Sequence, residues 1–418
     1  MRKALGSWKL TDLERRLCNI LDVAKRAVEQ LAPAGYADPN EPSDALRPEK
    51  VVAETAFLLL AASRLEAPEV ARRVGETARC LIPHARNDRM LLGLCLQPGL
   101  ALDFATAHIC LDRIGYRDTH FDAVLRKTLA SQASKGQERV PYRILEQEWL
   151  LRGLNLTSPV SASKLCVLSQ PMDLLTGNRD DFYAFTHSLL YLRDFNISPL
   201  PLPRGRRTLL AEAEAGLAWC LAGQDYDLGG ELLLSWPLTG YSWSPISTFA
   251  FRVLAHVEDE AGFLPAPNTS LKKADQLSGD ERAKYLLASA YHTVYVMGLL
   301  AALCLQDGRT PPERIDSKRA VPGAAAEILR IVNVCEPESH WRAEFAGLTS
   351  TEQDALAGML LAMALRQKAQ ERDFRTLSVL LATGWALGLT DSPIASQSAE
   401  LLERLAAFAP ASGAATAA

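Results

Sequence analysis

Hydrophobic positions along the chain recur at steps of three and four residues, the spacing that places them on one face of an α-helix. The first stripe consists of Leu10, Leu13, Leu17, Ile20, Leu21 and Ala24. Similar stripes predict helices over roughly 49–65, 68–83, 88–114, 120–133, 141–153, 180–194, 207–223, 228–236, 245–258, 282–305, 322–334, 351–370, 373–388 and 393–408. Strand-like alternation of apolar and polar residues is rare, so we expect an all-α chain.

Short polar turns separate many of these helices, for example at 115–118 and 223–227. Because short turns make neighbouring helices antiparallel, the pattern predicts helical hairpins that form an α/α toroid or an α-solenoid. Proline-rich stretches suggest an N-terminal helix and linker over 1–48 and a central body with a cavity over 49–305. A C-terminal helical portion over 306–409 would close the body or form its own domain, and 410–418 reads as a disordered tail.

Composition and motifs exclude several classes of function. The 418 residues are 48% hydrophobic and 22% charged, with a net charge of −4 and no long basic run, so nucleic acid is not an expected partner. No signal sequence or uninterrupted apolar span of about 18–20 residues is apparent, which favours a cytoplasmic protein without a membrane partner. The eight cysteines form no CxxC pair and read as buried thiols. Because glycine-rich phosphate loops are missing, no nucleotide cofactor is expected. The oligomeric state is not indicated.

The segment 180–194 carries the first candidate chemistry. On a helix, Tyr183, His187, Tyr191 and Asp194 share one face because they are spaced by four, four and three residues. His187 would shuttle protons or bind a metal ion, with Asp181 or Asp194 as orienting carboxylate and the tyrosines lining the site. The alternative is a buried, hydrogen-bonded histidine that follows an ordinary aspartate helix cap.

A second segment contains Tyr291, His292 and Thr293 within a strongly apolar stretch. His292 could simply belong to the core. However, the threonine–histidine pair here matches the pair Thr186 and His187, which favours one shared interior. In that arrangement His292 would be a second catalytic group, and Tyr291, Thr293 and Thr186 would bind substrate.

A divalent metal ion is a possible cofactor. His108, His187 and His292 lie on three different expected helices, and three histidines can bind zinc or iron. Because no HxxxH or HxxE pair is present, such a site would have to be assembled from distant segments.

A third segment runs from Asp225 to Glu231. Asp227 is well placed to cap the following helix, with Glu231 in its first turn, and this structural role is the favoured interpretation. The functional alternative places Asp225, Asp227 or Glu231 at the mouth of the cavity as a general acid or magnesium ligand, with Asp227 and Glu231 in contact with substrate.

The segments DDFYAFTHSLLYLRDF, DYDLGGELLL, EDEAGFLPAP and YHTVYVMGLL together resemble an uncharacterised family of bacterial helical proteins. Its members are similar in having a TH…FY.TDFG helix, an acidic D…EL helix start and a YHT helix. The resemblance covers roughly 85–305 and departs from the pattern at Arg193 and at Asn196, where glycine is expected. It implies a shared site and a natural-product setting but no named reaction, and it gives weight to Thr186, His187, Tyr191, Asp194, Asp227, Glu231, Tyr291, His292 and Thr293.

These features favour an enzyme of bacterial specialised metabolism with an acid/base or metal-assisted site in a helical funnel. It would act on a small molecule or a peptide by cyclisation, lyase or transfer chemistry. The alternative is a non-catalytic helical scaffold or carrier that binds a peptide, a protein or a hydrophobic ligand.

Overall fold

The computed structural model describes residues 10–31, 48–135, 138–156, 164–332 and 339–408. Throughout these ranges the regular structure is helical and no strand occurs, which confirms the prediction of an all-α chain. The expected tail 410–418, most of the proline-rich linker 33–48 and the thiol of Cys335 lie outside the described residues.

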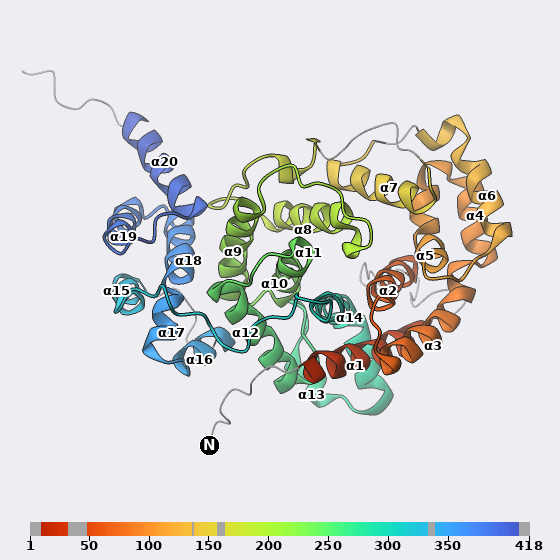
Figure 1. Cartoon of the computed structure of the whole chain (residues 1–418), viewed down its shortest axis with the longest axis horizontal. Helices are drawn as coiled ribbons and strands as arrows, with labels where there is room; N and C mark the ends of the chain where they lie inside the picture. The colour runs from red at the N-terminus through yellow and green to blue at the C-terminus, as the bar shows by residue number, and fades with distance from the viewer. Residues whose placement is uncertain (1–9, 32–47, 136–137, 157–163, 333–338, 409–418) are drawn as a thin grey trace, which may run out of the picture.

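Six helices follow one another in a circuit of packed neighbours (Figure 1). Each packs against the next, and the last packs back against the first. In order, these helices are α2 (Pro48–Ala62), α5 (Ala101–Arg113), α7 (Pro141–Gly153), α8 (Arg179–Arg193), α10 (Tyr226–Leu233) and α14 (Gly279–Cys304). The circuit therefore joins segments that are more than 200 residues apart in the sequence.

Further helices cover this circuit from outside. α1 (Leu10–Glu29) packs against α14 and α3 (Pro68–Ala85), and α3 also packs against α2. α4 (Asp88–Leu96) and α6 (Thr119–Leu129) pack against α5, whereas α9 (Arg206–Ala222) and α12 (Pro245–Ala261) pack against α10. The short helices are α11 (Ser235–Thr239), α13 (Leu271–Gln276), η2 (Pro98–Leu100), η3 (Gln132–Lys135), η5 (Val167–Ser169) and η6 (Asp194–Asn196).

The stripe predicted as one helix over 88–114 is broken. α4 ends at Leu96, Pro98 begins η2, and the chain turns by 116° between the two parts. Proline has no N–H to continue the hydrogen-bond ladder and disfavours helical backbone in the residue before it. The periodicity was continuous across this point, but the proline starts a new helix.

The C-terminal helices are arranged around α18 (Ala357–Gln370), which packs against α9. Arg366 of α18 donates hydrogen bonds to the carbonyl oxygens of Leu174 and Gly177 and lies 4.3 Å from the centre of the Trp219 ring. These contacts hold the region against α9 and against the segment that precedes α8. Its other helices are α15 (Ala324–Ile331), α16 (His340–Ala346), α17 (Ser350–Ala355), α19 (Phe374–Ala386) and α20 (Pro393–Phe408).

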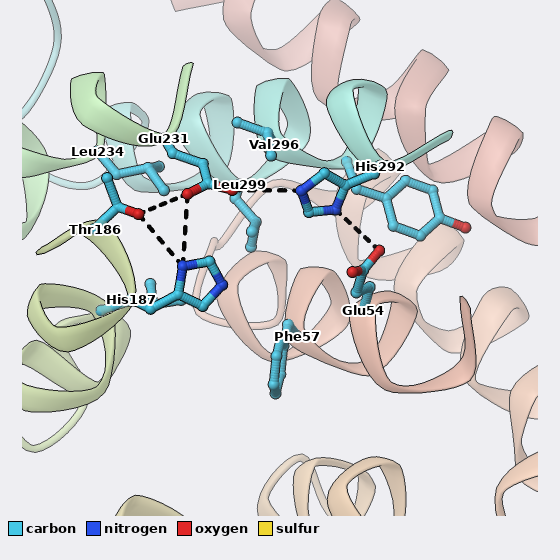
Figure 2. Close-up of a pocket in the computed structure, with 11 residues that line it drawn as sticks. Glu54, Phe57, Thr186, His187, Glu231, Leu234, His292, Val296 and Leu299 are labelled. Carbon is cyan, nitrogen blue, oxygen red and sulfur yellow. Dashed lines mark hydrogen bonds and ion pairs between the residues drawn. The ribbon is translucent and has the colours of Figure 1, made fainter. Parts of the chain in front are cut away.

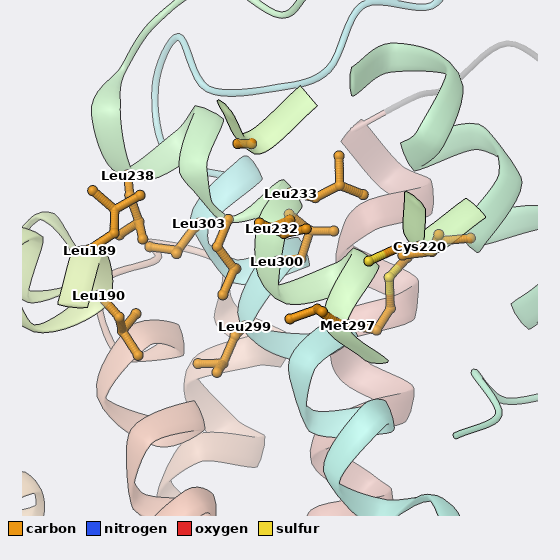
Figure 3. Close-up of a cluster of buried hydrophobic side chains, with 14 of the residues drawn as sticks. Leu189, Leu190, Cys220, Leu232, Leu233, Leu238, Met297, Leu299, Leu300 and Leu303 are labelled. Carbon is orange, nitrogen blue, oxygen red and sulfur yellow. The ribbon is translucent and has the colours of Figure 1, made fainter. Parts of the chain in front are cut away.

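The core beneath α10 and α14 is apolar. Leu232 and Leu233 of α10 pack with Met297, Leu300 and Leu303 of α14 (Figure 3). By length and composition α14 would suffice to cross a membrane, but 72% of its most apolar window is buried inside the protein. Burial of that extent is typical of a core helix.

Candidate functional site

A small cavity lies where α2, α8, α10 and α14 meet (Figure 2). Its volume is about 50 Å³, which is room for a few water molecules or one functional group of a ligand. Most of the lining is apolar, but the carboxylates of Glu54 and Glu231 and the imidazoles of His187 and His292 border the same space. The lining residues are Glu54, Phe57, Thr186, His187, Leu190, Glu231, Leu234, His292, Tyr295, Val296 and Leu299.

His187 is positioned by the first half of α8. Its ring stacks on that of Tyr183, with 3.8 Å between ring centroids, and the edge of Tyr142 lies against it. The Nδ1 atom is 3.0 Å from the carbonyl oxygen of Tyr183. Because a carbonyl oxygen only accepts, Nδ1 carries the proton and leaves Nε2 as the acceptor of the neutral ring. Figure 2 shows that this second nitrogen faces the space beside Phe57.

Asp227 and Glu231 are four residues apart on α10 and therefore lie on the same face of the helix. Asp225, and not Asp227, caps this helix, because its side chain accepts a hydrogen bond from the backbone N–H of Leu228. The favoured capping role of Asp227 was therefore wrong, and this carboxylate is available to the interior. Glu231 is only 4% exposed, and its Oε2 accepts a hydrogen bond of 2.6 Å from the hydroxyl of Thr186.

His292 of α14 lies between three carboxylates. Its Nε2 atom is 3.3 Å from Oε1 of Glu231 and 3.7 Å from Oδ1 of Asp227. On the other side of the ring, Nδ1 is 3.1 Å from Oε2 of Glu54 in α2. The next residue, Thr293, donates a hydrogen bond of 2.7 Å to Oδ1 of Asp227. The imidazole of His292 thus links α2 to α10.

The two histidines have opposite electrostatic environments. Burial lowers the pKa of His187, and the nearby carboxylate of Glu231 only partly offsets this effect. For His292, burial also acts to lower the pKa, but the carboxylates of Glu54, Asp227 and Glu231 outweigh it and raise the pKa well above 6.5. At neutral pH the site therefore holds a neutral ring at His187 and a charged ring at His292.

A second, larger hollow of about 300 Å³ lies on the other side of His292. Asp227 and His292 line it, together with Arg179, which donates a hydrogen bond of 2.7 Å to Oδ2 of Asp227. His292 is 23% exposed and borders both spaces. The other residues that line this larger hollow are Lys50, Ala266, Pro267, Asn268, Ala288, Ser289, Tyr291 and Thr293.

The three tyrosines predicted from the sequence, Tyr183, Tyr191 and Tyr291, lie around the site but are not among the residues that line the inner cavity. Tyr191 is buried and donates a hydrogen bond of 2.7 Å to Glu146 of α7, whose other oxygen accepts from Arg143. Tyr183 stacks on His187, and Tyr291 lines the outer hollow. Burial raises the pKa of all three phenols, so they remain protonated at neutral pH.

Asp181 and Asp194 lie apart from the cavity and have structural contacts. Asn178 caps α8, and Asp181 accepts a hydrogen bond from the backbone N–H of that residue. Asp194 ends the helix with φ of 49° and accepts hydrogen bonds from Trp149 and Arg113. Both aspartates were expected near the chemistry, but the structure uses them at the two ends of α8.

The turn after α8 accommodates Asn196, at which the resemblance had led us to expect glycine. Asp194, Phe195 and Asn196 all have positive φ, with 65° at Asn196. Glycine adopts this left-handed region without strain, and asparagine tolerates it better than most other residues. Asn196 therefore stands where glycine was expected, at a positive φ that asparagine adopts with little strain.

His108 does not join His187 and His292. It is fully buried on α5, where its Nε2 is 3.0 Å from Asp122 of α6 and its Nδ1 accepts from Arg86. The expected set of three histidines around one metal ion is therefore not assembled. Within the described ranges, the group with suitable ligand spacing is instead Asp227, Glu231 and His292, whose ligand atoms all lie within 4.8 Å of one another.

Glu54 and Arg179 were missed by the sequence reasoning. Glu54 stands alone as an acidic residue in the apolar run VVAETAFLLLAA, and a lone charge in such a run is a signal of a buried functional group. Arg179 lies directly before the two aspartates of the first candidate segment. No local signal tied it to Asp227, because the two residues are brought together by the contact between α8 and α10.

Comparison with known proteins places the chain in one family. No curated protein and no solved structure matches it. A family model described as a domain of unknown function (DUF6895) matches residues 18–302, well over half of the 418 residues. The match includes α2, α8, α10 and nearly all of α14, which confirms the expectation of an uncharacterised family. The chain belongs to the DUF6895 family of domains of unknown function.

Proposed function

We propose that this protein is an enzyme that acts on a small molecule or a peptide, with His187, Glu231 and His292 at its reaction centre. The observation that carries the proposal is the convergence of two carboxylates and two imidazoles, from four different helices, on one cavity with a mostly apolar lining. A few polar groups that converge in an apolar pocket are the usual signature of a catalytic or binding site.

The energetics support a functional role for this cluster. Burying a charged group is unfavourable, and a buried ion pair is often no more stable than apolar residues of similar volume. Glu54, Asp227 and Glu231 surround His292 where α2, α10 and α14 pack together, next to a core made mainly of apolar side chains. A fold selected only for stability would gain little from this arrangement.

The pairing of a neutral His187 with a charged His292 fits acid/base chemistry. Two titratable groups whose environments push their pKa values apart are suited to act as base and acid in one reaction. The outer hollow beside His292 would hold most of the substrate, because the inner cavity has room for only one functional group. Cyclisation, elimination and group transfer on a metabolite of bacterial specialised metabolism are the reactions we propose for this cytoplasmic site.

The architecture that we propose for this site is an α/α toroid. It is supported by the circuit of helices from α2 through α5, α7, α8 and α10 to α14, with α14 packed against α2. The outer layer of α1, α3, α9 and α12 matches a second ring of helices. In such a fold the inner helices direct their polar side chains toward a common funnel.

The substitution His187→Phe, with His108→Phe as its matched control, tests the proposal. His108 is fully buried and the side chain of His187 is only 16% exposed; both rings stack on an aromatic ring and have a pKa lowered by burial. Phenylalanine keeps the stacking in each case. The three proteins are incubated with a small-molecule extract of the producing cells, and consumed or formed compounds are identified by mass spectrometry.

We expect His187→Phe to abolish every change that the wild-type protein causes, with unfolding free energy within about 1 kcal/mol of the wild type. His108→Phe should keep the activity but lose about 2 kcal/mol or more, since Arg86 and Asp122 would lose their buried partner. If the wild-type protein changes no compound, or if His187→Phe remains active, the enzyme proposal fails in favour of a scaffold or carrier.

A further inference from the structure

We propose that Asp227, Glu231 and His292 bind a divalent transition-metal ion such as Zn²⁺, Mn²⁺ or Fe²⁺. The inference deepens the proposed function and rests on it for the catalytic role of the ion, which would take the place of the proton on Nε2 of His292. The three side chains come from two packed helices, α10 and α14, and approach one another from opposite sides. This group differs from the three histidines that the sequence had suggested.

The distances around Nε2 of His292 fit co-ligands of a metal better than a direct ion pair. A charge-assisted hydrogen bond between nitrogen and a carboxylate oxygen normally spans about 2.7–2.9 Å. Here Nε2 is 3.3 Å from Glu231 and 3.7 Å from Asp227, which is too long for two good bonds of that kind. Two ligands that lie about 2.05 Å from a tetrahedral ion are separated by about 3.3–3.4 Å.

Each candidate ligand is also held by a second group on the side away from the others. Nδ1 of His292 faces the carboxylate of Glu54 at 3.1 Å, which is the carboxylate–histidine pairing common behind metal ligands. Oε2 of Glu231 accepts from the hydroxyl of Thr186, which leaves Oε1 directed at His292.

Asp227 is fixed in the same way from two directions. Arg179 donates a hydrogen bond of 2.7 Å to Oδ2, and Thr293 donates one of 2.7 Å to Oδ1. These bonds restrict the rotation of the carboxylate and hold Oδ1 toward the imidazole. A group that is preorganised in this manner loses little conformational entropy when it binds an ion.

The remaining coordination positions have access to ligand. His292 borders both the inner cavity and the outer hollow, so an ion on Nε2 could hold a water molecule or a substrate oxygen. Glu231 also borders the inner cavity, on the side of His187. One imidazole with two carboxylates suits zinc, manganese or ferrous iron, whereas magnesium and calcium prefer oxygen ligands alone.

Metal titration of the purified full-length protein tests the site directly. After treatment with a chelator and its removal, Zn²⁺, Mn²⁺ and Mg²⁺ are each titrated at pH 7.5 by calorimetry. We expect one equivalent of Zn²⁺ or Mn²⁺ to bind at least about 100-fold more tightly than Mg²⁺. Thr293→Val, which removes only an orienting hydroxyl, should weaken this binding by about 10–100-fold.

His292→Gln should abolish stoichiometric binding, with His256→Gln as its matched control. His256 forms a pair with Glu260 at 3.2 Å on an exposed face of α12, so its loss should leave the affinity unchanged. The d–d absorption of Co²⁺ bound to the wild-type protein provides an independent reading of nitrogen and oxygen coordination. If His292→Gln fails to fold, the loss of affinity in Thr293→Val and the Co²⁺ spectrum of the wild-type protein show whether the ion binds at this site.

Three results would overturn the metal site: no stoichiometric binding by the wild-type protein, equal affinity for Mg²⁺ and Zn²⁺, or equal loss in the variants of His292 and His256. These outcomes leave the enzyme proposal standing if His187→Phe abolishes turnover. Conversely, tight binding of Zn²⁺ without any turnover would support the metal site and remove its catalytic role.

Discussion

The substitution Thr186→Val isolates one hydrogen bond of the proposed site. Thr186 is 4% exposed, and its hydroxyl is 2.6 Å from Oε2 of Glu231 and 2.9 Å from the carbonyl oxygen of Tyr183. The single hydroxyl proton goes to the closer, charged acceptor. Valine has nearly the same shape as threonine, so the change removes this bond without opening a cavity.

The expected loss follows from what remains around Glu231. After the substitution, Oε2 keeps Nδ1 of His187 as its nearest donor, at 3.5 Å, which is beyond a normal hydrogen bond. A buried hydrogen bond to a charged group contributes about 1.5–3 kcal/mol. We therefore expect Thr186→Val to lower the free energy of unfolding by about 2 kcal/mol.

Thr106→Val is the matched control. Thr106 is also 4% exposed on a helix, but its hydroxyl donates to the carbonyl oxygen of Leu102 in the preceding turn, at 2.9 Å. That carbonyl already accepts the backbone hydrogen bond of the helix. Loss of the second bond should lower the free energy of unfolding by only about 0.5 kcal/mol.

The assay is equilibrium unfolding in urea at pH 7.5 with a chelator present, followed by far-UV circular dichroism and tryptophan fluorescence. Coincident transitions and equal slopes against urea are required for the comparison. If both valine variants lose the same free energy, the hydrogen bond from Thr186 does not act on a charged acceptor. That result would also contradict the role of Glu231 as the charged partner of His292.

Two further predictions concern regions outside the reaction centre itself. Burial lowers the pKa of His108 below its usual value near 6.5, so the unfolded chain takes up this proton first as the pH falls. The free energy of unfolding should therefore decline below about pH 6.5 more steeply in the wild type than in His108→Gln, and equal slopes would contradict it. In α10, a methyl group at Gly230 would lie 2.8 Å from Val296, whereas one at Gly229 would meet only ordinary contacts. Gly230→Ala should lose about 1–3 kcal/mol and Gly229→Ala should gain up to about 1 kcal/mol in urea unfolding, and the reverse order would refute the close approach of α10 to α14.

The all-α fold could be predicted because helical periodicity is a local property. The stripe that begins at Leu10 becomes α1, whose Leu13, Leu17, Leu21 and Ala24 are all buried. The predicted helix boundaries were wrong where one residue ended a helix within a continuous periodic stretch, as at Pro98. Which helices become neighbours depends on long-range packing, such as the contact of α14 with α2, and no local pattern encodes it.

The candidate site was predictable in part, because a polar residue within an apolar helix is also a local signal. His187 and His292 each stood out as polar groups within apolar helices, and both line the cavity. His108 had the same local appearance, but the structure pairs it with Asp122 and Arg86, away from the cavity. A histidine within an apolar helix can therefore face the cavity or a neighbouring helix. The residues that pack against it from other helices determine which of the two occurs.

Glu231 is the residue on which the two proposals converge. The neighbouring carboxylates of Glu54 and Asp227 each have a cationic partner in the lining of the larger hollow. Lys50 lies 3.6 Å from Glu54, and Arg179 donates a hydrogen bond to Asp227. Within the part of the chain that the structure describes, Glu231 has no lysine or arginine partner, only the two histidines and Thr186. Its buried charge must therefore be balanced by the imidazolium of His292 or by a bound cation. Since one imidazole cannot carry a proton on Nε2 and bind an ion there, proton and metal compete for the same place, and the metal titration decides which one the site is built to hold.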